Sequence, residues 1–329
     1  MAGFNRIEKL IAAVPPALAL RAGLELDIFT KIGDGAVTAD RLGALLAVDP
    51  ERLSRLLYAL ASVGLLDVED GLFRNGPEAS TFLDAAKPTH RGGDHELLRE
   101  LWSADLLTAD SLRENRPAAL HDFLEAGPEA ATAFSRKIAP GALTFGRNLA
   151  QGMDLSAVGS VIDIGGGPGT VLVGVRERWP HVAATLMELP PVAAVARTIL
   201  SEYGVEDVVV EEGDITASPS RSRHDLVILK AVVQVLPPEQ ARRSILNAAR
   251  CLTPGGEIVI AGWGVIDDDR LGPPDGVFLN LTFLNLYRHG ESYTEGQYRA
   301  WMAEAGFCNT TRSRLPDGCT LFRARLDAQ

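Results

Sequence analysis

The sequence predicts an α/β fold with a doubly wound parallel sheet, preceded by a smaller, mainly α-helical N-terminal domain. From Val158 onward, short apolar strands alternate with amphipathic helices, a pattern typical of parallel strands joined by crossover helices. The first ninety residues instead show helical apolar spacing followed by a short hairpin. The length of 329 residues is also greater than one domain usually needs.

The N-terminal domain is expected to be a winged helix. An apolar stripe at helical spacing opens the chain, and we expect Pro15-Pro16 to end that helix before a second one over residues 17–26. Thr38 and Asp49 are N-cap candidates for two further helices. The segment around Glu69-Asp70-Gly71 predicts a hairpin. The stripe consists of Ile7, Leu10, Ile11 and Val14.

Charge and composition argue against several classes of partner. The net charge is −11, and residues 1–90 hold nine Lys/Arg against twelve Asp/Glu, so the winged helix offers little to phosphates. Its apolar helices are expected to pack against a second subunit. Three widely spaced cysteines, no signal-peptide pattern and no apolar run of bilayer length predict a cytoplasmic protein without a membrane span.

We expect three parts along the chain: a dimerisation domain over 1–95, a helical linker over 96–150 that contributes to the substrate pocket, and a sheet domain over 151–329. The linker shows helical stretches with polar breaks. The predicted strands of the sheet domain lie near 158–166, 183–189, 207–214, 225–230 and 257–263.

The motif with the clearest chemistry is VIDIGGGPGT, residues 161–170. Asp163 closes a strand, and the glycines after it allow backbone N–H groups to approach a ligand at a helix N-terminus. An acid before the glycines suits a cationic amino-acid group better than a pyrophosphate. Glu188, Asp214 and Lys230 end the next three strands, and open α/β sheets bind ligands at such ends.

These motifs together resemble the plant-type small-molecule O-methyltransferases and their bacterial relatives. The resemblance covers nearly the whole chain and implies a Rossmann-like domain that binds S-adenosylmethionine (SAM), releases S-adenosylhomocysteine and needs no metal. It also implies a homodimer formed through the N-terminal winged-helix domain. The segments that carry it are VIDIGGGPG, MELPPV (187–192), Gly213-Asp214-Ile215, Lys230 and the residues after it, LTPGGEIVI, and YTEGQYRAWMAEAGF (293–307).

The resemblance implies roles for individual residues. The methionine portion of SAM would lie at Asp163, Gly165 and Gly167, and the ribose at Glu188. The adenosine would be surrounded by Asp214, Ile215 and Lys230. The residues expected to bind the acceptor are Trp102, Phe134, Ile138, Asn280, Phe283 and Tyr287.

One departure from the family pattern concerns the reaction itself. The family carries Lys-x-x-x-His-Asp-Trp, in which histidine is the general base, whereas this chain has Gln234 in the histidine's place and Val235 after it. The glutamate that orients the histidine falls near Ser292. A carboxamide can position a group by hydrogen bonds but cannot take up a proton near neutral pH. Gln234 is therefore expected to position rather than to act as a base.

Loss of the base favours an acceptor that needs no deprotonation. A thioether sulfur has a lone pair and no proton, so we expect an acceptor such as 4-methylthio-2-hydroxybutyrate. A carboxylate is also already ionised. Candidate partners for a carboxylate on the substrate are Arg136, Lys137, Arg147 and Arg288.

Other hypotheses remain open. One is O-methylation of a hydroxyl or carboxylate with a substitute base. A second is a family member that binds SAM without transferring its methyl group, and a third is a winged-helix regulator that binds SAM without catalysis. The histidines that could replace the base are His90, His95, His121 and His289.

Overall fold

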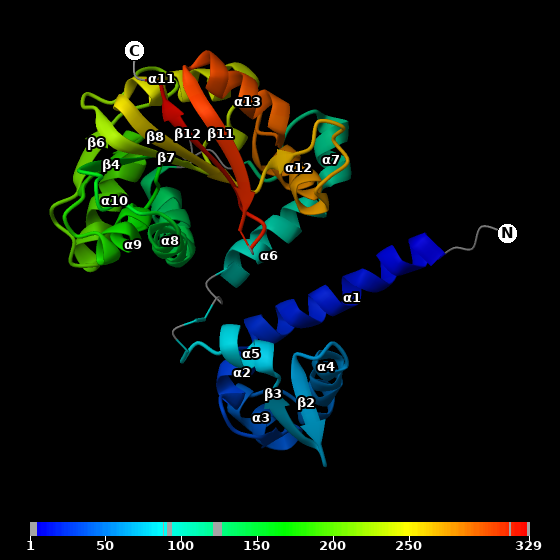
Figure 1. The fold of residues 1–329 in the computed structure, drawn as a ribbon. Coiled ribbons are helices and arrows are strands. Elements are labelled where there is room, and N and C mark those ends of the chain that lie inside the picture. Colours follow the sequence, from blue (N-terminus) through cyan, green and yellow to red (C-terminus); the bar gives the residue numbers. More distant parts are fainter. Residues whose placement is uncertain (1–4, 88, 91–93, 121–126, 316, 328–329) are drawn as a thin grey trace. The chain divides into compact units, whose positions relative to one another are not determined.

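The computed structural model describes residues 5–87, 89–90, 94–120, 127–315 and 317–327 (Figure 1). The chain divides into two compact units, Met1–Arg99 and Glu100–Gln329. Most of the segment 96–150 belongs to the second unit. Among the described residues, no helix is both long and apolar enough to cross a membrane.

The N-terminal unit is a helical domain with a three-stranded sheet in the order β1-β3-β2. The predicted caps are confirmed, because Thr38 Oγ1 accepts the N–H of Arg41 at 3.3 Å and Asp49 Oδ1 accepts the N–H of Arg52 at 2.8 Å. The predicted hairpin is formed by β2 and β3. The elements are α1 (Asn5–Glu25), α2 (Ile28–Ile32), β1 (Val37–Thr38), α3 (Ala39–Leu46), α4 (Pro50–Ser62), β2 (Leu66–Glu69), β3 (Leu72–Asn75) and α5 (Pro77–Phe82).

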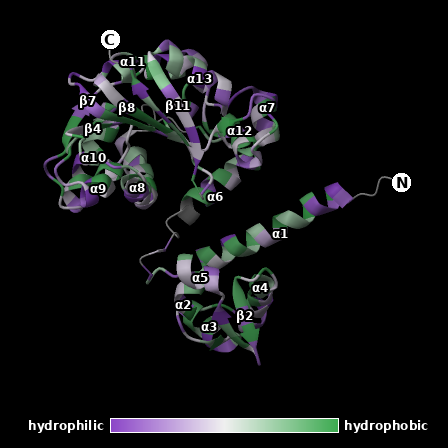
Figure 2. Ribbon diagram, in the orientation of Figure 1, coloured by the Kyte–Doolittle hydropathy of each residue, from purple (hydrophilic) through white to green (hydrophobic). Residues whose placement is uncertain are grey.

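The expectation that Pro15-Pro16 ends the first helix is wrong. Helix α1 runs from Asn5 to Glu25 with both prolines inside it. Proline has a φ compatible with a helix, but it lacks the backbone donor and its ring crowds the carbonyl group four residues earlier. Helix α1 is exposed at this point, so water can bind the carbonyl groups left without a partner. The apolar residues therefore continue along one helix (Figure 2). Those that are about half exposed or more are Ile7, Leu10, Ile11, Val14 and Leu18.

The second unit is built on a seven-stranded sheet in the order β11-β12-β8-β7-β4-β5-β6. The pairs among β8, β7, β4, β5 and β6 are parallel, as predicted, whereas β12 runs antiparallel to both β8 and β11. The strands β11 and β12 were not among those predicted from the sequence. The strands are β4 (Ser160–Ile164), β5 (Ala183–Glu188), β6 (Val209–Glu212), β7 (His224–Lys230), β8 (Leu252–Gly262), β11 (Phe307–Arg314) and β12 (Thr320–Leu326), with β9 (Val265–Ile266) and β10 (Tyr293–Thr294) as a separate pair.

Helices cover both faces of this sheet (Figure 1). The core on one face includes residues of α8, α9 and α10, and the core on the other includes residues of α11 and α13. Residues 226–229 of β7 are all 0% exposed, which explains their continuous apolar run. The helices are α6 (Asp94–Asp105), α7 (Thr108–Glu114), α8 (Gly127–Gly152), α9 (Thr170–Arg178), α10 (Pro190–Glu202), η1 (Val233–Val235), α11 (Pro238–Arg250), α12 (Pro274–Leu286) and α13 (Glu295–Glu304).

Two glycines allow α8 and α9 to pack backbone against backbone. A Cβ on Gly174 would lie 2.6 Å from the carbonyl oxygen of Leu143 and 2.7 Å from the amide nitrogen of Arg147. A Cβ on Gly146 would overlap the carbonyl oxygen of Val171. The close packing fixes α8 beside the start of α9, where the glycine loop ends.

Candidate functional site

The loop from β4 to α9 has a backbone that favours glycine. Gly165, Gly167 and Gly169 have φ values of 65°, 55° and 78°, a region that other residues rarely adopt. Space also excludes a side chain at Gly165, because a Cβ there would lie 2.6 Å from Cγ2 of Val232. The loop leads into the first turn of α9, whose N–H groups lack partners within the helix. It can therefore present backbone donors to a ligand.

Asp163 lies beneath this loop. Its side chain is 0% exposed and packs against Gly166, where a Cβ would overlap Oδ2. Within the described residues, neither carboxylate oxygen has a hydrogen-bond partner. Burial raises the pKa of Asp163 to about 7, and the positive charge of Lys230 opposes that rise. A buried carboxylate without partners costs folding free energy, and a cation bound nearby would recover part of that cost.

Glu188 ends β5 next to the same loop. Its Oε2 would lie 3.7 Å from a Cβ on Gly165, and the side chain is 9% exposed. Burial raises the pKa of Glu188 to about 7, and backbone hydrogen bonds from Leu189 and Gly167 oppose this. The negative charges of Asp163 and Asp214 raise the pKa further. The structure thus brings together three carboxylates that the sequence placed at successive strand ends.

Asp214 and Ile215 follow β6 at the same edge of the sheet. The N–H of Gly213 donates to the carbonyl oxygen of Glu188 at 3.0 Å, so the two strand ends are joined. Asp214 Oδ1 accepts the N–H of Thr216 at 2.8 Å, and Ile215 is 6% exposed. Asn247 of α11 donates from Nδ2 to the carbonyl oxygen of Ile215 at 2.7 Å. Asp214 is exposed. Ile215 is buried, and its backbone is fixed by the hydrogen bond from Asn247.

Lys230 ends β7 between two aromatic rings. Its Nζ lies 5.5 Å from the ring centroid of Phe145 and 5.2 Å from that of Trp263, distances that allow cation–π attraction. Trp263 follows β8 and donates from Nε1 to the carbonyl oxygen of Asp317 at 3.2 Å. The sequence placed Lys230 at this sheet edge but gave no indication of either ring.

Ile138 of α8 reaches the glycine loop. Its Cδ1 would lie 3.3 Å from a Cβ on Gly167. The neighbouring residue, Ala139, accepts a hydrogen bond at 2.8 Å from Oγ1 of Thr170, the first residue of α9. Thr170 is 0% exposed, so this bond fixes α8 over the loop. Sequence reasoning missed Thr170, which looks like an ordinary helix residue after a glycine loop.

Gln234 lies in the short helix η1 and is 5% exposed. Its Oε1 accepts the N–H of Gly264 at 2.9 Å. A Cβ on Gly264 would lie 2.9 Å from Cε2 of Phe283 and 3.2 Å from Cβ of Gln234, so Phe283 and Gln234 lie side by side there. The ring of Tyr287 is 5.6 Å from that of Phe283, centroid to centroid. The structure therefore brings Gln234 together with two of the residues predicted to bind the acceptor, Phe283 and Tyr287.

Hydrogen bonds of Asn280 and Ser292 with backbone groups link α12 to the segment before β10. The N–H of Ser292 donates to Oδ1 of Asn280 at 2.6 Å, and the Ser292 hydroxyl donates to the carbonyl oxygen of Gly276 at 2.8 Å. Ser292 is 1% exposed. Ser292, which stands near the position expected for the orienting glutamate, thus connects its loop to α12.

Burial removes Tyr287 as a base near neutral pH. Burial raises the pKa of Tyr287 to about 12, so its phenol stays protonated and can donate a hydrogen bond. Trp102 on α6 and Phe134 on α8 are half-buried.

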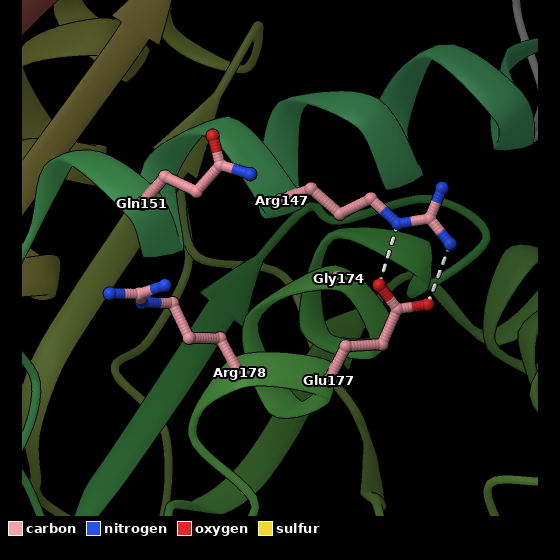
Figure 3. Close-up of a pocket in the computed structure, with 5 residues that line it drawn as sticks. All are labelled: Arg147, Gln151, Gly174, Glu177 and Arg178. Carbon is pink, nitrogen blue, oxygen red and sulfur yellow. Dashed lines mark hydrogen bonds and ion pairs between the residues drawn. The ribbon is translucent and has the colours of Figure 1, made fainter. Parts of the chain in front are cut away.

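Three of the four candidate partners for a substrate carboxylate already have carboxylate partners. Arg136 pairs with Glu202 through two hydrogen bonds of 2.9 and 2.6 Å, and Lys137 pairs with Glu100. Arg147 pairs with Glu177 at 2.6 and 2.7 Å across a pocket between α8 and α9 (Figure 3). This pocket lies along the later part of α9, away from the glycine loop, and is lined by Arg147, Gln151, Gly174, Glu177 and Arg178.

The candidate substitute bases are scattered. His289 is exposed and precedes Gly290, where a Cβ would lie 3.0 Å from Cδ2 of Tyr287 and 3.1 Å from the carbonyl oxygen of Gln234. His90 is exposed in the N-terminal unit. His121 lies outside the described residues, and His95 is described only as part of the backbone of α6. Among the described residues, no group of three or more His, Cys, Asp or Glu side chains could hold a metal ion.

Comparisons with known proteins match both units of the chain. The family model described as an O-methyltransferase domain matches residues 117–308, and an O-methyltransferase dimerisation domain matches residues 16–85. A 3-hydroxy-5-methyl-1-naphthoate 3-O-methyltransferase of Streptomyces sahachiroi is 27% identical over 301 residues, which cover 89% of this chain and 86% of the relative. The N,N-dimethyltransferase OxyT of Streptomyces rimosus is 28% identical over 310 residues, with coverage of 91% and 89%.

The fold matches solved structures over its whole length. The crystal structure of an O-methyltransferase from Nostoc punctiforme superposes with a TM-score of 0.84 at 18% identity, and covers 99% of each chain. At 18% identity, this superposition shows a shared fold and nothing about the reaction. The predicted arrangement of a Rossmann-like sheet domain after a smaller helical domain is confirmed.

Proposed function

Because the chain belongs to the O-methyltransferase family, we propose that it transfers the methyl group of SAM to an acceptor atom that needs no deprotonation, with thioether sulfur foremost. The chain is a SAM-dependent small-molecule methyltransferase. Relatives are named for transfer to oxygen and to nitrogen, so family membership leaves the accepting atom open.

The residues at the sheet edge fit a cationic methyl donor. Bound SAM supplies a methyl group that its sulfonium already activates, so the protein mainly has to align donor and acceptor. Asp163 offers a buried carboxylate whose oxygens have no hydrogen-bond partner within the described residues, and the loop above it offers backbone donors. We assign to SAM the residues Asp163, Gly165, Gly167, Glu188, Asp214, Ile215 and Lys230.

The observation that carries the choice of acceptor is the environment of Gln234. Its side-chain oxygen already binds the Gly264 N–H, and an amide cannot accept a proton near neutral pH. Tyr287 stays protonated because burial raises its pKa to about 12. A phenol with a pKa near 10 gains about 10²–10⁴-fold from a base, whereas a thioether gains nothing. We place the acceptor among Gln234, Ile138, Asn280, Phe283 and Tyr287, with Trp102 and Phe134 as outer contacts.

The test is methyl transfer from radiolabelled SAM to a panel of 4-methylthio-2-hydroxybutyrate, benzoate, N-methylaniline and 2-naphthol. We expect the thioether to be methylated fastest, at a rate that stays constant between pH 7.5 and 9. Gln234→Ala should lower kcat by less than 10²-fold, because no proton transfer is lost. Transfer to 2-naphthol alone, with a rate that rises with pH, would refute the thioether assignment.

A second candidate is O-methylation with His289 as a substitute base. The observation that favours it is that Gly290, the next residue, packs against Tyr287 and the backbone of Gln234. Under this alternative His289→Ala abolishes transfer to 2-naphthol and leaves SAM binding intact. Under the first proposal the same variant keeps most of its activity.

We also propose that the protein is a cytoplasmic homodimer formed through its N-terminal unit. The dimerisation domain matched over residues 16–85 supports the homodimer. The exposed apolar residues of α1 give such an interface a continuous surface. The three cysteines are all unpaired thiols, which agrees with a reducing compartment.

A further inference from the structure

Both backbone polar groups of Gly264 form hydrogen bonds. Its N–H donates to Oε1 of Gln234 at 2.9 Å, and its carbonyl oxygen accepts the N–H of Tyr293 at 3.1 Å. Gly264 lies between the end of β8 and the start of β9. Gln234 therefore fixes the corner between these strands and, through it, the start of β10.

The same corner is tied to α12. Ser292, next to Tyr293, bonds to Oδ1 of Asn280 and to the carbonyl oxygen of Gly276, both in α12. Gly276 also packs tightly on the corner, since a Cβ there would lie 2.7 Å from the carbonyl oxygen of Val265. Phe283 of α12 lies against Gly264. The position of α12 thus depends on the corner that Gln234 holds.

The short helix that carries Gln234 also rests on the glycine loop. Val232, two residues earlier, has Cγ2 within 2.6 Å of where a Cβ on Gly165 would lie. Val232 is half-buried and Val233 is 2% exposed. One turn of chain therefore touches the loop assigned to SAM on one side and the corner that supports α12 on the other.

We propose that Gln234 is a positioning residue that acts through the backbone of Gly264: it sets the position of α12, and so the fit of the acceptor, relative to the glycine loop. This inference rests on the proposed function, because it concerns the same acceptor site. The side-chain oxygen of Gln234 is committed to the backbone and does not touch the reacting atoms. Its loss changes acceptor binding more than the rate of the chemical step.

Three variants test this. Gln234→Met keeps the length of the side chain but removes the acceptor for the Gly264 N–H, whereas Gln234→Glu keeps an oxygen there. Ser292→Ala removes the bond from its hydroxyl to α12. The control is Ser244→Ala in α11, which also removes a buried hydroxyl, one that donates to the carbonyl of Ala241 at 2.7 Å within its own helix.

The first readout is amide hydrogen exchange at Gly264 in the whole protein, with and without S-adenosylhomocysteine. Gln234→Met should accelerate exchange at Gly264 at least tenfold, and Gln234→Glu should restore protection. Unchanged exchange in Gln234→Met would overturn the proposal. If Gln234→Met does not fold, faster exchange across α12 in Ser292→Ala, and not in Ser244→Ala, supports the proposal, and unchanged exchange refutes it.

The second readout is steady-state kinetics with the panel compound that the enzyme methylates. Gln234→Met should raise the KM for the acceptor about tenfold while kcat and the KM for SAM change less than threefold, and Gln234→Glu should restore the acceptor KM. A 100-fold loss of kcat at constant KM would show direct action on the reacting atoms and overturn the proposal. If no panel compound is methylated, the proposed acceptor class fails, whereas hydrogen exchange still decides the role of Gln234.

Discussion

The carboxylate of Asp163 lies directly beneath Gly166, so closely that a Cβ at position 166 would overlap Oδ2. The same Cβ would also lie 2.7 Å from Cδ1 of Leu186, a fully buried side chain. The strand end and the loop therefore fit only when residue 166 has no side chain.

Gly166→Ala should destabilise the protein and weaken cofactor binding together. Overpacking a buried position typically costs about 1–3 kcal/mol, and the displaced loop should bind S-adenosylhomocysteine at least tenfold more weakly in calorimetry. Gly152→Ala, where a Cβ would meet nothing within 4 Å, is the matched control and should behave like the wild type. Equal affinity in both variants would contradict the assignment of the loop to the cofactor.

The stability of the ligand-free protein should fall as pH rises through neutrality. Burial raises the pKa values of Asp163 and Glu188 from 3.8 and 4.5 to about 7. A raised pKa contributes stability that is fully present below the pKa of the unfolded state and is lost as pH rises through the folded value. Thermal unfolding without ligand should therefore give a lower Tm at pH 8 than at pH 6.

SAM binding should show the opposite trend, because its positive charges favour ionised carboxylates. Affinity should rise between pH 6 and pH 8 by roughly tenfold for each carboxylate that must ionise. The positive charge of Lys230 lowers the pKa of Asp163, and the negative charge of Asp214 raises that of Glu188. Asp163→Asn should flatten part of the dependence. An affinity that stays constant over this range in the wild type would contradict this role for the pair.

Thr170→Val should loosen α8 over the glycine loop. The variant keeps the shape of the side chain but leaves the carbonyl oxygen of Ala139 without its 2.8 Å hydrogen bond, which should cost about 1–3 kcal/mol. Ile138, next to Ala139, should then hold its place at Gly167 less firmly, so affinity for S-adenosylhomocysteine should fall severalfold. Thr132→Val, which removes an exposed bond within α8, should change neither quantity by much. Similar losses in both variants would show a general effect on α8.

Charged residues on the apolar face of α1 should separate the two subunits. Leu10 and Ile11 are 63% and 67% exposed, so Leu10→Glu with Ile11→Glu leaves the folded unit intact while opposing burial against a second copy. Light scattering should show a monomer. Lys9→Glu, on the opposite side of the helix by its spacing, should remain a dimer. A dimer in both variants would place the interface elsewhere.

The sequence predicted the sheet domain well because its signals are local. Continuous apolar strands, a glycine loop and acids at the strand ends need no knowledge of distant residues. The helix end predicted at Pro15-Pro16 is wrong because proline can adopt a helical φ. Helix α1 is exposed there, so water can donate hydrogen bonds to the carbonyl groups that lose their backbone donors. Strands β11 and β12 were missed because charged residues interrupt their apolar positions.

The arrangement of the candidate acceptor site was harder to predict from the sequence, because it depends on contacts between segments far apart in the chain. Nothing in the residues around Gln234 shows that its oxygen binds Gly264, thirty residues later. Ser292 and Asn280 likewise acquire their partners only through the fold. The ion pairs of Arg136, Lys137 and Arg147 are also set by packing between helices, so their chemical character alone did not show that they were engaged.

The two glycines where α8 meets α9 limit how this chain can diverge. Surface pairs such as Arg147 and Glu177 can be exchanged or lost at little cost, but no residue is smaller than glycine, and a methyl group at Gly146 or Gly174 would collide with the backbone of the facing helix. If α12 and η1 set the fit of the acceptor as proposed, variants of this sequence can change their acceptor preference there while the crossing of α8 and α9 stays unchanged.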